Sequence, residues 1–280
     1  MYCGRRIHRE KTERLRTKHD KTNDRPRVTA ILLAAGRGTR MGSSVRKQFM
    51  ELAGRPVLSW SLSVLAKSPV ISDIVLVIPD GTSEEIRKNR YFIEREFVDT
   101  LGSDSSRVAS IVPGGSERYN SVYNGIEAIT WPCDYVFIHD GARPLITEKT
   151  LETLLAAVIQ YKAVVAACPS KDTVKITDDS GFVSSTPDRS HVWNIQTPQC
   201  FEYELIKNSY EKVVGAEKES DAAASLCRQD EALRKITDDA MIVEYASDIK
   251  IRPIDTGCQN IKITTPEDLM IAETLMRNRT

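Results

Sequence analysis

The sequence has few residues of the kinds that hold a metal ion or cross-link a small secreted domain. It contains four histidines, none in an HxxxH or HExxH pattern, and six cysteines, none in a CxxC pair. We therefore expect no protein-ligated metal, and the scattered cysteines predict reduced core thiols in a cytoplasmic protein. No apolar run approaches the roughly 18 residues that a membrane-spanning helix requires, so no membrane partner is expected.

The chain carries no net charge, but its charges are unevenly distributed. Residues 1–27 hold ten Lys or Arg and four Asp or Glu, a net charge of +6, which leaves about −6 for the remainder. This basic head has little apolar periodicity and no apolar signal-peptide core. A basic arm can bind nucleic acid, but we interpret this one as a disordered, solvated extension and expect no nucleic-acid partner. Residues 28–280 are then predicted to form one domain.

Apolar strand patterns alternate with helical patterns over residues 28–169. Buried strands are predicted at 28–33, 72–80, within 107–115, within 133–144 and at 162–169, with helices at 56–67, 83–97, 116–129 (Ser116 as N-cap) and 148–160. This alternation predicts a Rossmann-like, mostly parallel sheet with helices on both faces. Ligands bind such sheets at the carboxyl ends of the strands, which here are followed by the loops after Leu33, Val112 and Ile138.

The pattern changes in the last third of the chain. Residues 172–196 alternate apolar and polar side chains around a turn signal at 178–181, which predicts a protruding β-hairpin arm over about 171–193. Such an arm needs a covering surface, and a second subunit is one candidate. The segments expected after it are helices at 201–213 and 218–234, a helix capped by Thr237 or Asp238, a strand within 248–255 and a closing helix with Thr265 as N-cap and Pro266 in its first turn.

The loop after the first strand combines glycines with positive charge. Gly36 and Gly38 lack a Cβ atom, so a ligand can approach the backbone N–H groups closely. Four cations and no acid follow within residues 37–47, namely Arg37, Arg40, Arg46 and Lys47. The loop lacks the lysine of a P-loop and the third glycine of a dinucleotide fingerprint, which argues against a Rossmann dehydrogenase. A polyphosphate ligand, most simply a nucleotide, is predicted.

Two further segments bring charged residues toward the same edge. HDGARP, at 139–144, ends the fourth strand with Asp140 and Arg143, and Lys262 lies in a late extended segment. Taken singly, the first pair also fits a loop ion pair and Lys262 also fits a solvated edge lysine. His139 is expected to be a packed histidine at the strand end rather than a catalyst.

Taken together, seven collinear segments over residues 28–280 resemble the 2-C-methyl-D-erythritol 4-phosphate cytidylyltransferases. They are AAGRGTRMGSSVRKQF, PGGSERYNSVYNGI, HDGARP, DTVK, QTPQCF, ITDDA and NIKITTPEDL. The resemblance implies that CMP passes from CTP to methylerythritol 4-phosphate, with Mg²⁺ held mainly by the CTP phosphates. An anionic phosphate oxygen needs no strong base to attack, which suits a site rich in Arg and Lys and poor in His.

The resemblance also implies roles for individual residues. Arg40, Lys47 and Lys262 would stabilise the charge at the α-phosphate as catalytic residues. CTP would be bound by Ala34, Ala35, Gly36, Gly38, Gly115 and Ser121. The acceptor would be bound by Asp140, Arg143, Thr173, Arg189, Thr197 and Thr237. Arg189 lies in the arm and would reach the site of a neighbouring subunit, which predicts a homodimer.

Three features depart from the family pattern. Arg46 stands where proline is usual, which predicts a less rigid loop, and Gly141 replaces alanine with a mild effect expected. Residues 214–235 resemble an insertion, which makes the register around Thr237 less certain.

Other functions remain open at this point. A ribitol 5-phosphate cytidylyltransferase would share the fold and the CTP loop, but HDGARP and DTVK favour the methylerythritol enzymes. A sugar-1-phosphate nucleotidyltransferase shares the GxGTR loop without the other segments. A non-catalytic nucleotide-binding protein is disfavoured by the joint presence of Arg40, Lys47, Asp140 and Lys262.

Overall fold

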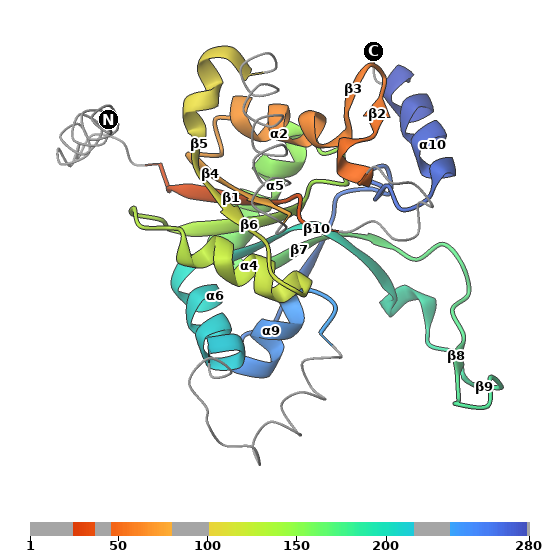
Figure 1. Cartoon of the computed structure of the whole chain (residues 1–280). Coiled ribbons are helices and arrows are strands. Elements are labelled where there is room, and N and C mark those ends of the chain that lie inside the picture. The colour runs from red at the N-terminus through yellow and green to blue at the C-terminus, as the bar shows by residue number, and fades with distance from the viewer. Residues whose placement is uncertain (1–24, 37–45, 80–100, 216–235, 279–280) are drawn as a thin grey trace, which may run out of the picture.

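The computed structural model describes residues 25–36, 46–79, 101–215 and 236–278 (Figure 1). The helices expected at 83–97 and 218–234 lie outside these residues, as do residues 1–24 of the basic head and the site candidates Gly38 and Arg40.

A seven-stranded sheet lies at the centre of the molecule, with the strand order β11-β7-β10-β6-β1-β4-β5 (Figure 1). Its strands are β1 Val28–Leu33, β4 Asp73–Ile78, β5 Val108–Pro113, β6 Tyr135–Asp140, β7 Ala163–Pro169, β10 Trp193–Glu202 and β11 Arg252–Asp255. β10 runs antiparallel to both of its neighbours, and the other neighbouring strands pair in parallel. The sheet is therefore mostly parallel and Rossmann-like, which confirms the predicted fold class.

Helices cover both faces of this sheet because its central strands are buried on both sides. The helices are α2 Val57–Lys67, α4 Arg118–Glu127, α5 Glu148–Tyr161, α6 Tyr203–Tyr210, α9 Asp239–Ala246 and α10 Pro266–Arg277. On one face, α2 and α5 share an apolar cluster with Ala30 and Leu32 of β1. On the other, α4, α6 and α9 share a second cluster with Ile31 of the same strand. The alternation along β1 thus divides the core into two layers.

Several short elements complete the described chain. They are β2 Glu51–Leu52, β3 Arg55–Pro56, β8 Ile176–Thr177, β9 Val183–Ser185, the 3-10 helices Lys47–Phe49, Gly102–Arg107 and Arg189–His191, and a π-helical turn at Glu211–Gly215. α10 packs beside β2 through a third, smaller apolar cluster that contains Leu52, Ile263 and Ala272. Thr265 caps α10, as predicted, in a capping box with Asp268.

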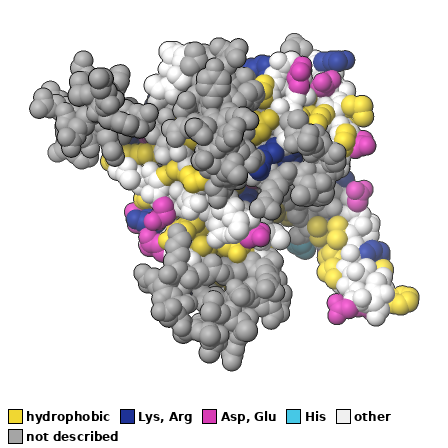
Figure 2. Space-filling view, in the orientation of Figure 1, with side chains coloured by type: hydrophobic (Ala, Val, Ile, Leu, Met, Phe, Trp, Pro, Cys, Tyr) yellow, Lys and Arg dark blue, Asp and Glu magenta, His cyan; other side chains and the backbone are white. Residues whose placement is uncertain are grey.

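β8 and β9 form the tip of an arm that projects from the body of the molecule (Figure 1). Its turn is at the predicted place, because the amide of Gly181 donates to the carbonyl of Asp178 and Gly181 has a φ of 83°. The arm exposes Phe182 and Val183 to solvent, and Figure 2 shows hydrophobic side chains along it. The predicted arm is therefore present as a protruding element.

Two expectations about local structure were wrong. The alternating pattern up to residue 196 was assigned to the arm, and a helix was expected from residue 201. Instead, β10 occupies 193–202 and α6 begins at Tyr203. Pro198 interrupts the strand pattern, and the ladder with β7 is irregular between Ile195 and Gln199, so the sequence lacked an ordinary strand signal there. The N-cap of α4 is Glu117 rather than Ser116.

None of the helices within the described residues is long and apolar enough to cross a membrane. The cysteines in this part of the chain, at positions 133, 168, 200 and 258, are all free thiols.

Candidate active site

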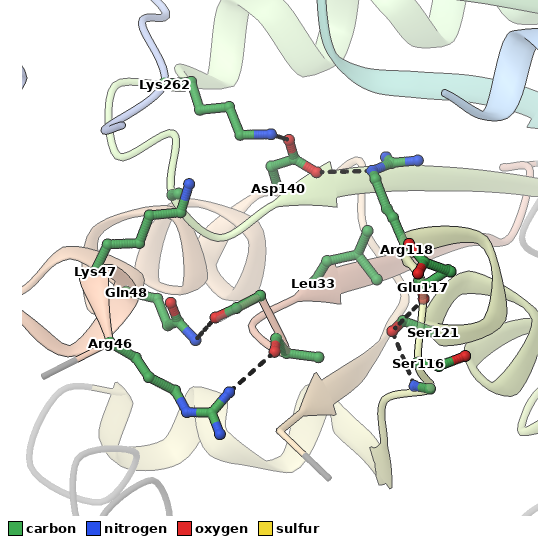
Figure 3. A pocket seen from close by; sticks show the side chains of 14 residues that line it. Leu33, Arg46, Lys47, Gln48, Ser116, Glu117, Arg118, Ser121, Asp140 and Lys262 are labelled. Atoms are coloured by element: carbon green, nitrogen blue, oxygen red, sulfur yellow. Dashed lines mark hydrogen bonds and ion pairs between the residues drawn. The ribbon is translucent and has the colours of Figure 1, made fainter. Parts of the chain in front are cut away.

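A cavity of about 510 Å³ opens at the carboxyl ends of the parallel strands (Figure 3). Its walls come from the end of β1, the segment 46–48, the turn that leads into α4, the end of β6, and Lys262. The loops after Leu33, Val112 and Ile138 therefore meet here, as the parallel topology predicts.

The segment 46–48 holds the chain that leaves β1. The side-chain amide of Gln48 donates to the carbonyls of Ala34 and Gly36, and the guanidinium of Arg46 donates to the carbonyl of Ala35 at 3.3 Å. Three successive carbonyls are thus bound from one side, which fixes the strand end that lines the cavity. The φ of Arg46 is −65°, the angle that proline would impose, so this backbone suits the proline usual in the family.

Glycines allow the loop after β5 to pack closely against this strand end. A Cβ atom at Gly114 would lie 2.4 Å from the Cβ of Ala35, and one at Gly115 would lie 2.4 Å from the Cβ of Asn120. The amide of Gly115 donates to the hydroxyl of Ser121 at 3.0 Å. Ser121 therefore supports the turn as well as lining the cavity.

Asp140, at the end of β6, lies between two cations. Lys262 Nζ is 2.6 Å from one carboxylate oxygen, and Arg118 Nε is 3.4 Å from the other (Figure 3). Burial alone would raise the pKa of Asp140, but Arg118, Lys262 and Arg143 together hold that pKa well below its usual range. Asp140 is consequently an ionised hydrogen-bond acceptor in a buried position.

His139 precedes Asp140 in β6 and is fully buried. Its Nε2 lies 3.2 Å from the carbonyl of Arg143, which can only accept, so Nε2 carries the proton. Its Nδ1 then accepts from the hydroxyl of Thr197 at 3.1 Å, and that hydroxyl accepts from the amide of Asp140 at 3.0 Å. Burial lowers the pKa of His139 to about 4. The expectation of a packed rather than catalytic histidine agrees with this arrangement.

A smaller cavity of about 200 Å³ continues beyond Asp140 and Arg118. Arg143, Thr197 and Thr237 line it. Arg143 donates to the carbonyl of Asn260 at 2.8 Å, while its Nε is buried without a hydrogen-bond partner. Burial lowers the pKa of Arg143. Asp238 lines the same cavity and is the N-cap of α9, so of the two predicted caps, Thr237 and Asp238, the second is confirmed.

The structure brings together most of the predicted site residues that it describes. The larger cavity is lined by Ala35, Gly36, Lys47, Gly115, Ser121, Asp140 and Lys262. Ala34 is buried beside it and bound through its carbonyl by Gln48. Thr173 and Arg189 lie instead on the exposed arm, where Arg189 donates to the carbonyl of Lys171. These two residues line neither of the two cavities described above.

Sequence reasoning missed Arg118 and Gln48. Both stand inside segments that carried the family resemblance, SERYN and RKQF, but neither forms part of a spacing pattern with a chemical meaning of its own. Arg118 binds Asp239, which is 121 residues away, through two hydrogen bonds of 2.9 and 2.8 Å. A contact of that separation has no local signal in a single sequence.

Acidic and metal-binding side chains are sparse around the cavity. In the described ranges, no three His, Cys, Asp or Glu side chains gather in a way that could hold a metal ion. The carboxylates that line the larger cavity are those of Glu117 and Asp140, and Asp140 is already bound by two cations. This donor set fits a divalent ion whose ligands come mainly from a substrate's phosphates.

Comparison with known proteins agrees with this geometry. The family model for 2-C-methyl-D-erythritol 4-phosphate cytidylyltransferase (IspD) matches residues 28–278. The enzyme of that name from Lachnoclostridium phytofermentans is 42% identical over 251 residues, which cover 90% of this chain and 97% of that protein. The one from Alkaliphilus oremlandii is 38% identical, over 90% of this chain and 96% of that protein.

A solved structure supports the same relationship. The crystal structure of 4-diphosphocytidyl-2C-methyl-D-erythritol synthase from Anaerococcus prevotii superposes with a TM-score of 0.71 at 33% identity, over 90% of this chain and 96% of that one. The family match, the identities over most of the chain and the shared fold lead to one conclusion. The chain belongs to the 2-C-methyl-D-erythritol 4-phosphate cytidylyltransferase family.

Proposed function

We infer that this chain transfers the CMP group of CTP to 2-C-methyl-D-erythritol 4-phosphate, giving 4-diphosphocytidyl-2-C-methyl-D-erythritol and pyrophosphate. Beside the family relationship, one observation carries this inference. Lys47, Lys262 and Arg118 converge on a cavity whose other wall is a backbone made accessible by glycines, with the ionised Asp140 between the last two cations. Such a cavity suits two phosphate-bearing substrates, a nucleotide and a polar acceptor.

The chemistry of the transfer needs positioning and charge more than proton transfer. An oxygen of the acceptor's phosphate attacks the α-phosphorus of CTP and forms a new P–O bond. The bond from the α-phosphorus to the bridging oxygen breaks, and pyrophosphate leaves with its electron pair. The attacking oxygen is already anionic, so no general base has to deprotonate it. The neutral, buried His139 is therefore not needed as a base.

Lys47 and Lys262 would stabilise the charge that develops on the α-phosphate. Lys47 extends from the 46–48 segment toward the part of the cavity where Lys262 and Asp140 lie (Figure 3). Arg40 would add a third cation, as the resemblance implies, although it lies outside the described residues. The ammonium groups of Lys47 and Lys262 act in a cavity that partly excludes solvent, which strengthens their effect on a phosphate.

The cytidine would lie along the strand end 34–36 and the turn at Gly115. Gln48 and Arg46 fix the carbonyls of the first segment and Ser121 fixes the amide of Gly115, so both edges are rigid before the nucleotide arrives. A preformed edge lowers the entropy cost of binding a flat base.

The acceptor would bind at the junction of the two cavities. Asp140 would accept hydrogen bonds from its hydroxyl groups, while Arg143, Thr197 and Thr237 line the smaller cavity beyond. Polar groups that remain unpaired in a buried place favour a ligand that pairs them, and Arg143 Nε is such a group.

The remaining acceptor-binding candidates would come from a second copy of the chain. Arg189 and Thr173 lie on the arm, whose exposed apolar side chains Phe182, Val183 and Ile176 are suited to a protein interface (Figure 2). We propose a homodimer in which each arm extends to the partner's site. The free thiols of the described residues support a cytoplasmic location.

Mg²⁺ is proposed as the cofactor, bound mainly to the CTP phosphates. When bound it would neutralise part of the triphosphate charge and polarise the α-phosphoryl group. Asp140 and Glu117 are the acidic side chains that the described cavity offers near it, and Asp140 is committed to Lys262 and Arg118.

Release of pyrophosphate from CTP tests the proposed function. Methylerythritol 4-phosphate, ribitol 5-phosphate and a hexose 1-phosphate are supplied side by side, with Mg²⁺ and, in a parallel series, with EDTA. We expect release with methylerythritol 4-phosphate and loss of it with EDTA. Preference for ribitol 5-phosphate would assign the sister activity, and no release with any acceptor would favour a non-catalytic nucleotide-binding protein.

A further inference from the structure

Arg118 links the predicted acceptor site to the helix α9, which lies on the same face of the sheet as α4. It is the first residue of α4, and its guanidinium donates twice to Asp239 at the start of α9. Its Nε faces Asp140 at 3.4 Å. One side chain thus connects the end of β6 with α4 and α9.

The Asp239 end of this link is rigid. Asp239 is fully buried, and its carboxylate also accepts from the hydroxyl of Tyr210 at 2.6 Å. The amides of Asp239 and Ala240 both donate to the side-chain carbonyl of Gln199 at 2.9 Å. Because Asp239 binds both terminal nitrogens of Arg118, the guanidinium plane is fixed and Nε can point in only one direction.

Each oxygen of the Asp140 carboxylate has a cation as its partner only when Arg118 is present. Arg118 and Lys262 face two carboxylates, Asp140 and Asp239. If Lys262 turned to a phosphate, Asp140 would still keep Arg118 as its partner. Without Arg118, the ion pair with Lys262 would be the remaining side-chain hydrogen bond that the described residues give the Asp140 carboxylate, and Lys262 would be held there, away from the phosphates.

Arg118 also stands where the two cavities meet. Together with Asp140 it lines both the cavity of about 510 Å³ and the cavity of about 200 Å³. Figure 3 shows Asp140 between Arg118 and Lys262, with each cation on a different carboxylate oxygen. The carboxylate that would meet the acceptor is thus oriented from the side of α4.

We propose that Arg118 is a positioning residue of the transfer: it holds the Asp140 carboxylate in place as the acceptor's hydrogen-bonding partner and lets Lys262 turn to the phosphates. This inference rests on the proposed function. It assigns to Arg118 a role in acceptor binding and turnover, and none in the recognition of CTP. The electrostatics agree with this role, because Arg118 lowers the pKa of Asp140 together with Lys262 and Arg143.

Steady-state kinetics of three variants test the proposal. In Arg118→Gln we expect the KM for methylerythritol 4-phosphate to rise about tenfold or more, as for loss of a charge-assisted hydrogen bond, with kcat reduced. The KM for CTP should change less than about twofold. Arg118→Lys keeps the charge without the fork and should recover part of the loss.

Arg118→Gln also leaves Asp239 without its cation, so the fold itself will be weakened. The double variant Arg118→Gln/Asp239→Asn removes that unpaired charge and should regain most of the lost Tm while keeping the raised acceptor KM. Tyr210→Phe is the matched control: it removes another hydrogen bond from Asp239 and should lower Tm with an unchanged acceptor KM.

The pH profile adds a readout that a purely structural role would not move. Removal of Arg118 raises the pKa of Asp140, so the acid limb of kcat/KM for the acceptor should shift to higher pH. A double variant with the wild-type acceptor KM and pH profile would overturn the positioning role, as would an equal rise in the KM for CTP. A wild-type enzyme without turnover would instead overturn the proposed function, and this inference with it.

Discussion

Lys47 is placed in the cavity by the short helix Lys47–Phe49, whose flanking residue Arg46 and internal residue Gln48 bind the carbonyls of the segment 34–36. Its position is thus tied to the strand end that would hold the nucleotide. A cation fixed in this way can stabilise charge in the transition state without reorganising first.

Lys47→Ala should therefore lower kcat by about 10²–10³-fold, by analogy with the loss of one donor from an oxyanion hole. Pyrophosphate release at saturating CTP measures it. Lys67→Ala, at the exposed C-terminal end of α2, is the matched control and should retain wild-type turnover. Near-normal turnover of Lys47→Ala would exclude the proposed role.

His139 gives the fold a defined response to pH. The pKa of His139 is about 4 in the folded state and about 6.5 when the ring is exposed. As the pH falls, the unfolded chain is therefore protonated at this residue before the folded chain is. The contribution of His139 to folding stability is therefore fully present above about pH 6.5 and is lost as the pH falls toward about 4. The loss between pH 7.5 and pH 5 amounts to about 2 kcal/mol.

Urea unfolding at pH 7.5, 6 and 5 measures this change, with His139→Gln for comparison. The variant lacks the titrating ring, so its stability should vary less with pH than that of the wild type. Asp140, whose folded pKa is lowered, contributes stability that is lost only below about pH 4, outside this range. Equal slopes in the two proteins would contradict the assignment to His139.

At this scale, the sequence could indicate residue types but not their partners. The cluster of glycines and cations after β1 was enough to predict a phosphate-binding edge, because it is contiguous. Asp140 and Lys262 are 122 residues apart and Arg118 and Asp239 are 121 apart, and only the fold brings each pair together. The pairing of the charges therefore could not be read from their order.

Elements were predictable where burial is uniform and not where it is interrupted. β1, β4 and β7 are continuous apolar runs, and they form near the places that their sequences predict. β10 contains Pro198 and a break in its ladder with β7, so its alternation was extended into the arm instead. The resulting error concerned one strand and left the ligand edge of the sheet unchanged.

α10 depends on its first turn for the placement of the segment that carries Lys262. One oxygen of Asp268 accepts from the amide and hydroxyl of Thr264 at 2.7 Å and from the amide of Thr265 at 2.8 Å. These bonds connect the helix to the extended chain just after Lys262. The same helix packs on Ile263 through Ala272.

Asp268→Ala should lower the free energy of unfolding by about 1–2 kcal/mol, the usual cost of a lost helix cap. Denaturant titration measures it, with an unchanged slope expected. Met270→Ala, at an exposed position of the same helix, should have a stability close to that of the wild type. Similar losses in both variants would show that helix propensity, and not the cap, determines the result.

At the scale of the whole molecule, a complete site is proposed to need two chains. The arm places Arg189 and Thr173 outside both cavities of its own chain, although the family resemblance assigns both to the acceptor. Mixed dimers can separate the two contributions, because one site of a heterodimer can combine the intact parts of both subunits.

Lys47→Ala and Arg189→Ala subunits, each inactive as a homodimer, should restore about one active site in two when combined. Pyrophosphate release by tandem-purified heterodimers measures the recovery. Lys47→Ala combined with Lys262→Ala provides the control, since both residues line the same cavity of one chain and no site would be intact. Failure of the first pair to recover would argue against a shared site.

The anchoring of α9 makes the chemistry of the site independent of how many residues join Gly215 to Ile236. Asp239 is fixed by Arg118, Tyr210 and Gln199, and α6 packs directly against α9. The chain that joins Gly215 to Ile236 therefore connects two ends that are held independently of it. Because the entropy cost of closing a loop grows only slowly with its length, this connection can gain or lose residues while Thr237 keeps its place beside the smaller cavity.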